Sequence, residues 1–261
     1  MINTPYILDF QQDDYPYLEE VNEGIIKQVA ITNKDLAILD VGAGRGSLGE
    51  TLKKKGYKIY AIESNEKAAH EASQKVDHVI TLDLHDIKGI HASLGDQKFK
   101  YIIFSDVLEH IYDPLEVIKN YKSFLAEDGL ILISLPNAVN WLNRIRFMFG
   151  HFNYEMTGVM DRTHIRFFTF YSAKKLVQAS ECVIEKVDCT PFIVRAFLPI
   201  IKRWFSKKND FSTNSIISSP YYKFYEKMIY PVEYIISRVL PSLFAFRIII
   251  VARALGRGCH R

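Results

Sequence analysis

The stretch that decides the fold is ILDVGAGRGSLGETL, residues 38–52. An apolar run at 36–41 leads into a cluster of glycines, and residues 47–56 then have the composition of a helix that ends at Gly56. A strand, a glycine loop and a helix in this order are typical of a ligand-binding unit of an α/β sheet. Glycines lack Cβ atoms, so their backbone can approach a ligand closely.

Strand-like and helix-like segments alternate around this unit. We predict further strands at 57–63, 78–83, 101–106, 130–135, 182–190 and 244–255, and helices at 17–30, 65–75, 113–125 and 172–180. Such alternation indicates βαβ crossovers and a parallel sheet covered on both faces, which is a doubly wound α/β fold. Residues 136–168 lack periodicity, and we predict a long irregular stretch with a functional role there.

The composition excludes several classes of protein. The chain has 261 residues, of which 48% are hydrophobic and 24% charged, so it is neither disordered nor fibrous. No window of 18 uncharged apolar residues predicts a membrane-spanning helix, and the acidic start is not typical of a secretory signal. Cys182, Cys189 and Cys259 fit neither a disulfide framework nor a metal site. We therefore expect a reduced, cytoplasmic protein.

Charge is distributed unevenly along the chain. Residues 195–261 contain 12 Lys and Arg against 3 Asp and Glu, a net charge of +9, whereas the remainder carries −6. Within this part, residues 191–243 contain two apolar stripes at helical spacing, the second interrupted at Pro231. The first stripe comprises Phe197, Leu198, Ile201, Trp204 and Phe205. We predict a helical insertion at 191–243 in a core formed by 1–190 and 244–261.

The basic insertion has several candidate partners. Interleaved basic and aromatic residues can bind single-stranded nucleic acid, but no nucleic-acid motif supports that interpretation. A lid over the substrate or a homodimer interface is favoured over contact of residues 196–243 with an anionic membrane, which would make the protein peripheral at the inner membrane surface.

An acidic residue accompanies the glycine loop. Gly42, Gly44 and Gly46 are spaced G-x-G-x-G, and Ser47 stands where a dinucleotide fingerprint has its third glycine. This spacing argues against a nicotinamide-dependent oxidoreductase. Glu63 ends the next predicted strand, where a carboxylate can accept both hydroxyls of a ribose. The unit therefore predicts a nucleoside-containing cofactor.

Five motifs in sequence order strengthen this prediction. They are ILDVGAG (38–44), YAIE (60–63), LDLHD (82–86), YIIFSDVLEHIYDP (101–114) and LILISLPN (130–137). Together they resemble class I S-adenosylmethionine-dependent methyltransferases over residues 36–180. LEH, LPN and DRTHIRFFT (161–169) resemble the subgroup that includes ubiquinone-biosynthesis O-methyltransferases and glycan- and lipid-modifying enzymes. The resemblance implies a Rossmann-like, seven-stranded sheet with an antiparallel last strand, at 244–253.

The resemblance also implies a set of cofactor-binding residues. Asp40 and the backbone of 42–44 would hold the methionine part, Asp83 would contact the adenine amino group, and the Ser105 carbonyl would accept from the cofactor's amino group. The full set is Asp40, Gly42, Gly44, Glu63, Ser64, Asp83, Leu84 and Ser105.

Asp106, Glu109 and His110 are candidates for the chemistry, since their i, i+3, i+4 spacing places them on one face of a helical turn. In one interpretation His110 is the general base. In another the three residues bind a divalent metal, such as Mg²⁺, that lowers the pKa of a catechol-like acceptor. The resemblance favours the metal only in part: quinone O-methyltransferases carry an acidic-x-x-Glu-His set at this place, and this sequence has Asp in the first position. In a third interpretation, Glu109 and His110 have no chemical role and only fix the turn that leads to a helix cap at Asp113.

A second set of candidates lies in the irregular stretch. Asp161 and His164 could supply a carboxylate and a base over the acceptor, or the segment could be a buried polar turn. Asn137, Asn140 and Trp141 would line the acceptor pocket, unless the asparagines serve only as turn residues.

The favoured function is therefore O-methylation of a hydroxyl on a glycan or a lipid-linked small molecule, with S-adenosylhomocysteine as product. The alternatives are metal-assisted methylation of a quinone-like ring and a cofactor-binding module without activity.

Overall fold

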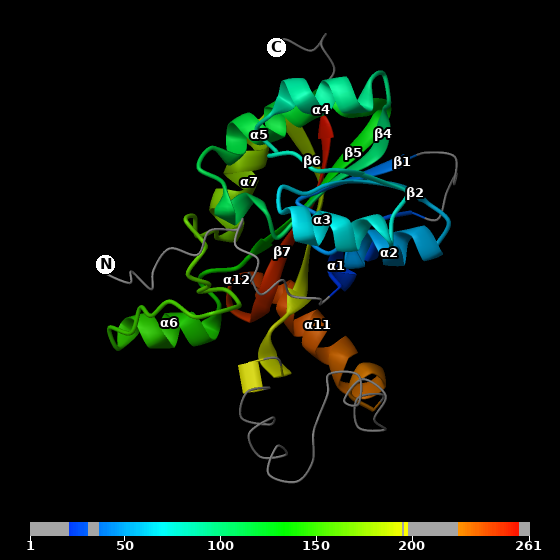
Figure 1. Cartoon of the computed structure of the whole chain (residues 1–261). Coiled ribbons are helices and arrows are strands. Elements are labelled where there is room, and N and C mark those ends of the chain that lie inside the picture. Colours follow the sequence, from blue (N-terminus) through cyan, green and yellow to red (C-terminus); the bar gives the residue numbers. More distant parts are fainter. Residues whose placement is uncertain (1–20, 31–36, 195, 198–223, 256–261) are drawn as a thin grey trace.

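A computed structural model describes residues 21–30, 37–194, 196–197 and 224–255 (Figure 1). Seven strands form one sheet in the order β3-β2-β1-β4-β5-β7-β6. They are β1 (Ala37–Val41), β2 (Lys58–Ile62), β3 (His78–Ile80), β4 (Phe99–Ser105), β5 (Leu125–Pro136), β6 (Cys182–Pro191) and β7 (Ala245–Ala254). The first five strands pair in parallel, and β7 lies antiparallel between β5 and β6. The predicted sheet, with its antiparallel last strand, is confirmed.

Helices cover both faces of the sheet (Figure 1). They are α1 (Glu23–Ile26), α2 (Ser47–Lys54), α3 (Glu66–Ser73), α4 (Ile87–Leu94), α5 (Pro114–Tyr121) and α7 (Phe170–Ala179). Successive side chains of a strand point to opposite faces. Accordingly, Leu39 of β1 belongs to the apolar core that includes residues of α4, α5 and α7, whereas Ile38 belongs to the core with α1 and α2. The sheet is therefore buried on both sides, as in other doubly wound folds.

The N-terminal helix is shorter than predicted. Residues 17–20 lie outside the described part, and α1 covers only Glu23–Ile26 of the predicted 17–30. The amides of Gln28 and Val29 donate to carbonyls three residues back, so the chain tightens into turns and the helix ends.

Two helices are absent from the prediction. Helix α6 (Trp141–Met148) lies inside the stretch predicted to be irregular, and Asn140 caps its first turn. Its apolar residues recur at helical spacing over only two turns, inside a stretch of mixed polar and aromatic residues, and the only one of its residues that is buried is Asn143. Helix α4 begins at an Asp86 cap, and it buries only Ile90 and Leu94.

The described part of the insertion is helical. It contains the π-helical turn η3 (Tyr225–Ile229), α11 (Tyr230–Val239) and α12 (Pro241–Phe244), and Pro231 stands in the first turn of α11. Most of the first apolar stripe, residues 198–205, lies outside the described residues. Among the described residues, no helix has the length and apolar character needed to cross a membrane.

Candidate active site

The glycine loop turns sharply at the carboxyl end of β1. Gly42, Gly44 and Gly46 have φ values of +70°, +54° and +76°, a region that side-chain-bearing residues rarely adopt. The Gly42 amide donates to the Ile62 carbonyl at 2.8 Å. A Cβ atom on Gly42 would lie 2.7 Å from Cγ2 of Val107, so the loop also packs tightly against the segment after β4. Both the backbone conformation and the packing therefore require glycine at position 42.

Glu63 joins the loops that follow β1 and β2. Its Oε2 accepts from the Gly44 amide at 2.8 Å, its Oε1 accepts from the Asn65 amide at 2.9 Å, and the residue is 5% exposed. These two bonds hold the carboxylate beside the glycine loop. The half-buried Ser64 lies beside it, between β2 and α3. The geometry fits the predicted ribose contact, which stays a prediction.

Asp40 is a buried carboxylate in the strand below the glycine loop. It is 2% exposed, and its Oδ2 has no hydrogen-bond partner within the described part of the chain. Burial, together with the nearby Glu63, raises the pKa of Asp40 to about 7. A buried carboxyl oxygen without a partner is costly, and a cationic ligand would relieve that cost. Asp40 therefore fits the ammonium end of an amino-acid-containing cofactor.

The remaining predicted cofactor residues follow β3 and β4, whose carboxyl ends lie at the same edge of the sheet as that of β1. Asp83 is exposed, and its Oδ1 lies 2.7 Å from Nδ1 of His85. The Leu84 carbonyl accepts from the Tyr121 hydroxyl at 3.1 Å. Ser105 is the last residue of β4, and its hydroxyl accepts a hydrogen bond from the side-chain amide of Asn22. Their roles toward the cofactor stay predictions.

Asp106 lies in an ion pair that the sequence did not indicate. Its Oδ2 lies 2.8 Å from Nε of Arg247 on β7, and its Oδ1 accepts from the Ser134 hydroxyl at 2.9 Å. Asn22 also donates to this carboxylate, at 3.4 Å. Asp106 has a φ of +56°, an uncommon conformation for a residue other than glycine. The one available signal was an arginine inside the apolar run FAFRIII (244–250).

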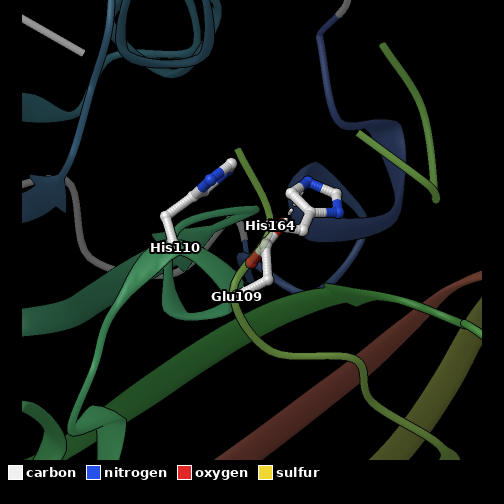
Figure 2. Close-up of side chains that lie close together, drawn as sticks. All are labelled: Glu109, His110 and His164. Atoms are coloured by element: carbon white, nitrogen blue, oxygen red, sulfur yellow. Dashed lines mark ion pairs between the residues drawn. The ribbon is translucent and has the colours of Figure 1, made fainter. Parts of the chain in front are cut away.

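The structure groups Glu109 and His110 with His164 rather than with Asp106. Figure 2 shows Glu109 and His110 on adjacent positions of η1 (Leu108–His110), with His164 approaching from the loop before α7. Each residue offers one potential ligand atom, and these atoms lie within 4.8 Å of one another. The amides of Ile165 and Arg166 both donate to the Glu109 carbonyl, at 3.1 and 3.0 Å, which holds the two segments together.

Hydrogen bonds orient both imidazole rings. Nδ1 of His110 lies 3.2 Å from the Thr163 carbonyl, and Nδ1 of His164 lies 3.1 Å from the Val159 carbonyl. A carbonyl can only accept, so the proton of each neutral ring is on Nδ1 and Nε2 is the acceptor atom. Nε2 of His164 lies 3.9 Å from Oε1 of Glu109.

Burial disfavours charge on all three side chains of this cluster. Burial, with a contribution from His164, lowers the pKa of His110 to about 4, and burial also lowers the pKa of His164. Burial and the charge of Asp106 raise the pKa of Glu109 well above its ordinary value. Oε2 of Glu109 has no hydrogen-bond partner within the described residues. Two neutral imidazoles beside a carboxyl group can accept a proton or bind a cation.

Asp161 fixes the turn that carries His164. Its Oδ1 accepts from both the amide and the hydroxyl of Thr163, at 2.8 and 2.7 Å, and its carbonyl accepts from the His164 amide at 3.0 Å. Asp161 is 7% exposed. These contacts match the polar-turn interpretation of this segment.

The two asparagines after β5 also bond to the backbone. Nδ2 of Asn137 donates to the Ala245 carbonyl at 3.0 Å, and Oδ1 of Asn140 accepts from the Asn143 amide at 3.1 Å. They tie the start of α6 to β7. A contact of Asn137, Asn140 or Trp141 with an acceptor stays a prediction.

Comparisons with known proteins agree with this geometry. Residues 14–187 match a family described as a methyltransferase domain. The chain is 27% identical to the ubiquinone biosynthesis O-methyltransferase of Actinobacillus pleuropneumoniae serotype 7 over 186 residues, which are 69% of this chain and 76% of that protein. It is 29% identical to the enzyme of the same name from Haemophilus ducreyi over 106 residues, 38% of this chain and 45% of that protein. A solved structure of a methyltransferase from Archaeoglobus fulgidus, described as SAM-dependent, shares the fold, with a TM-score of 0.53 and 20% identity over 84% of this chain and 86% of that one.

The family match covers well over half of the sequence, so the chain belongs to the methyltransferase-domain family. It is an S-adenosylmethionine-dependent methyltransferase, as the resemblance of its sequence motifs implied.

Proposed function

We propose that this methyltransferase acts on oxygen, transferring the methyl group to a hydroxyl of a glycan or a lipid-linked small molecule. The observation that carries the proposal is the position of the cluster formed by Glu109, His110 and His164. Val107 packs against Gly42 of the cofactor loop, and Glu109 follows two residues later. Strands β1 and β4 are neighbours at the point where the strand order reverses, which is where open α/β sheets bind ligands.

The reaction needs a proton acceptor at this place. The acceptor oxygen attacks the methyl carbon in line with the leaving sulfur, the carbon–sulfur bond breaks, and S-adenosylhomocysteine leaves as a neutral thioether. The hydroxyl proton must go to a base as the oxygen attacks. His110 is unprotonated at pH 7, because burial lowers its pKa to about 4, and its Nε2 is the acceptor atom, although the low pKa also makes it a weak base. A well-placed base contributes about 10²–10⁴-fold to such a reaction.

A second candidate function is metal-assisted methylation of a quinone-like ring. Two imidazoles and one carboxylate suit zinc or another transition metal better than Mg²⁺, which prefers oxygen ligands. Histidines that bind metals commonly donate their second ring N–H to a carbonyl, and both rings here have that arrangement. A divalent ion held by these residues would lower the pKa of a catechol hydroxyl. The names of the relatives, ubiquinone biosynthesis O-methyltransferases, support this candidate.

One assay separates the two candidates. The protein is treated with EDTA and dialysed, and then given labelled S-adenosylmethionine with either 3,4-dihydroxybenzoate or a lipid-linked sugar. Zn²⁺, Mn²⁺ or Mg²⁺ is added to parallel reactions. Activity on the sugar without any ion supports the base mechanism, whereas activity on the catechol that requires Zn²⁺ or Mn²⁺ supports the metal mechanism.

Variants of the cluster provide the control. His110→Ala and His164→Ala should each lower turnover at least 100-fold without changing cofactor affinity, because both side chains belong to the cluster. His151→Ala removes an exposed histidine outside the cluster and should have no effect. Full activity in both cluster variants would disprove the proposed role of the cluster.

A further inference from the structure

The face of α11 that packs on the protein is polar. Glu233 and Ser237, which are 3% and 0% exposed, are the buried residues of this helix. Glu233 accepts from the Val194 amide and from the Tyr225 hydroxyl, both at 2.8 Å, and the Ser237 hydroxyl donates to the Phe244 carbonyl at 2.8 Å. These hydrogen bonds fix the helix against the segments that precede and follow it.

Two tyrosines complete this polar face. The Tyr234 hydroxyl donates to Oδ1 of Asp188 on β6 at 2.7 Å, and Nζ of Lys27 donates to the Tyr230 hydroxyl at 3.0 Å. The Lys27 ammonium also lies 4.7 Å from the centre of the Tyr230 ring. The orientation of α11 is therefore set by directional contacts rather than by an apolar stripe.

The opposite face of the helix is apolar and exposed to solvent. Its side chains are between 38% and 71% exposed: Met228, Ile229, Val232, Ile235, Ile236, Val239 and Leu240. They recur every three or four residues through η3 and α11, so they lie along one side. A surface helix of a soluble protein normally has the reverse arrangement, with its apolar side inward. An exposed apolar face of this length marks an interaction surface.

We propose that this face of α11 lies on the surface of an anionic lipid bilayer. Charge supports the choice: Lys227 and Arg238 of η3 and α11 are exposed, and the single acidic residue of α11, Glu233, points inward. Residues 195–261 carry a net charge of +9, so a second copy would bring two strongly basic segments together. Residues 225–239 are too few to cross a bilayer, but a helix of this length can lie in its interface.

Lipid binding by α11 can be tested independently of the proposed acceptor, because it is measured without turnover. It does deepen that proposal, since an enzyme held at a bilayer can reach a lipid-linked acceptor directly. Failure of either would leave the other intact.

The test is sedimentation of the full chain with vesicles of phosphatidylcholine alone or with 30% phosphatidylglycerol. Val232→Glu/Val239→Glu places two charges on the apolar face. Val183→Glu/Leu255→Glu makes the same change in charge at two exposed apolar positions outside α11, and is the matched control. We expect binding to the anionic vesicles, weakened at least tenfold in the α11 variant and less than twofold in the control. Val232→Asn/Val239→Asn should also weaken binding without adding charge.

Unchanged S-adenosylmethionine affinity in each variant shows that it is folded. Three results would overturn the proposal: no binding of the unaltered protein to anionic vesicles, equal binding to both kinds of vesicle, or equal binding of the α11 variant and the control. A dimer that forms without lipid, and that only the α11 variants abolish, would assign the face to a second copy instead.

Discussion

Cofactor binding should release a proton from Asp40. This carboxyl group is buried, and burial with the nearby Glu63 raises its pKa to about 7. In the free protein it is therefore protonated below pH 7. The cofactor carries an ammonium and a sulfonium charge, and a positive charge near Asp40 favours its ionised form. Binding at lower pH must then be accompanied by loss of the proton.

The size of the effect follows from the raised pKa. At pH 6 a group with a pKa of about 7 is about 90% protonated, so binding should release about 0.9 proton. The release falls to about 0.5 proton at pH 7 and to nearly zero at pH 9. The dissociation constant should rise about fivefold from pH 7 to pH 6 and about tenfold for each unit below pH 6.

Calorimetry measures this proton directly. The cofactor is titrated at pH 6 and pH 8 in buffers with different enthalpies of ionisation, and the slope of the observed enthalpy gives the number of protons released. Asp40→Asn should remove the release at pH 6, whereas Asp96→Asn, a change at an exposed aspartate, should retain it. The reasoning is refuted if the unaltered protein releases no proton at pH 6, or if the Asp40→Asn variant releases as much.

Three further predictions concern the same site. Glu63→Ala should weaken S-adenosylmethionine binding about 100-fold, near 3 kcal/mol, which calorimetry would detect; an unchanged affinity would remove Glu63 from the ribose role. Gly42→Ala should destabilise the protein by about 2 kcal/mol in urea, because of its positive φ and the contact with Val107, and an unaltered midpoint would argue against this loop geometry. Asp106→Asn should lower the free energy of unfolding by about 2–3 kcal/mol, because it removes the carboxylate that pairs with the buried Arg247. The double variant Arg247→Met/Asp106→Asn should recover part of that loss in urea unfolding, and no recovery would count against the ion pair.

Asp40→Asn should also change the pH dependence of folding. The Asp40 carboxyl group has a higher pKa in the folded protein than in the unfolded chain, so it ionises at lower pH when the chain is unfolded. As the pH rises from about 4 through 7, this difference lowers the stability of the folded protein. The asparagine variant should therefore gain stability relative to the unaltered protein at pH 8, and gain least at pH 4. Urea unfolding at the two pH values measures the difference, and a larger gain at pH 4 would contradict the sign.

The sequence allowed the sheet and the cofactor loop to be predicted because their signals are local. The apolar run of β1, the three glycines and Glu63 fall within a single βαβ unit, and each is visible in the order of residues alone. Helix α6 escaped prediction because its apolar residues span only two turns inside a stretch that mixes asparagine, glycine, arginine and aromatic residues.

The grouping of the catalytic candidates could be predicted only in part. Glu109 and His110 are neighbours in sequence, but the backbone hydrogen bonds from Ile165 and Arg166 that bring in His164 connect distant segments. The pairing of Asp106 with Arg247 likewise depends on β7 lying beside β5. Spacing along the chain contains no information about such contacts.

The central claim is that the methyl group goes to oxygen at the cluster of Glu109, His110 and His164. Its most direct test is to incubate the full chain with S-[methyl-¹³C]adenosylmethionine and a total extract of the source cells, and to identify the labelled product by NMR. The account predicts an O-methyl signal that the His110→Ala variant fails to produce and the His151→Ala control retains. A label recovered on nitrogen or carbon, or an O-methyl product formed equally well by the His110→Ala variant, would contradict it.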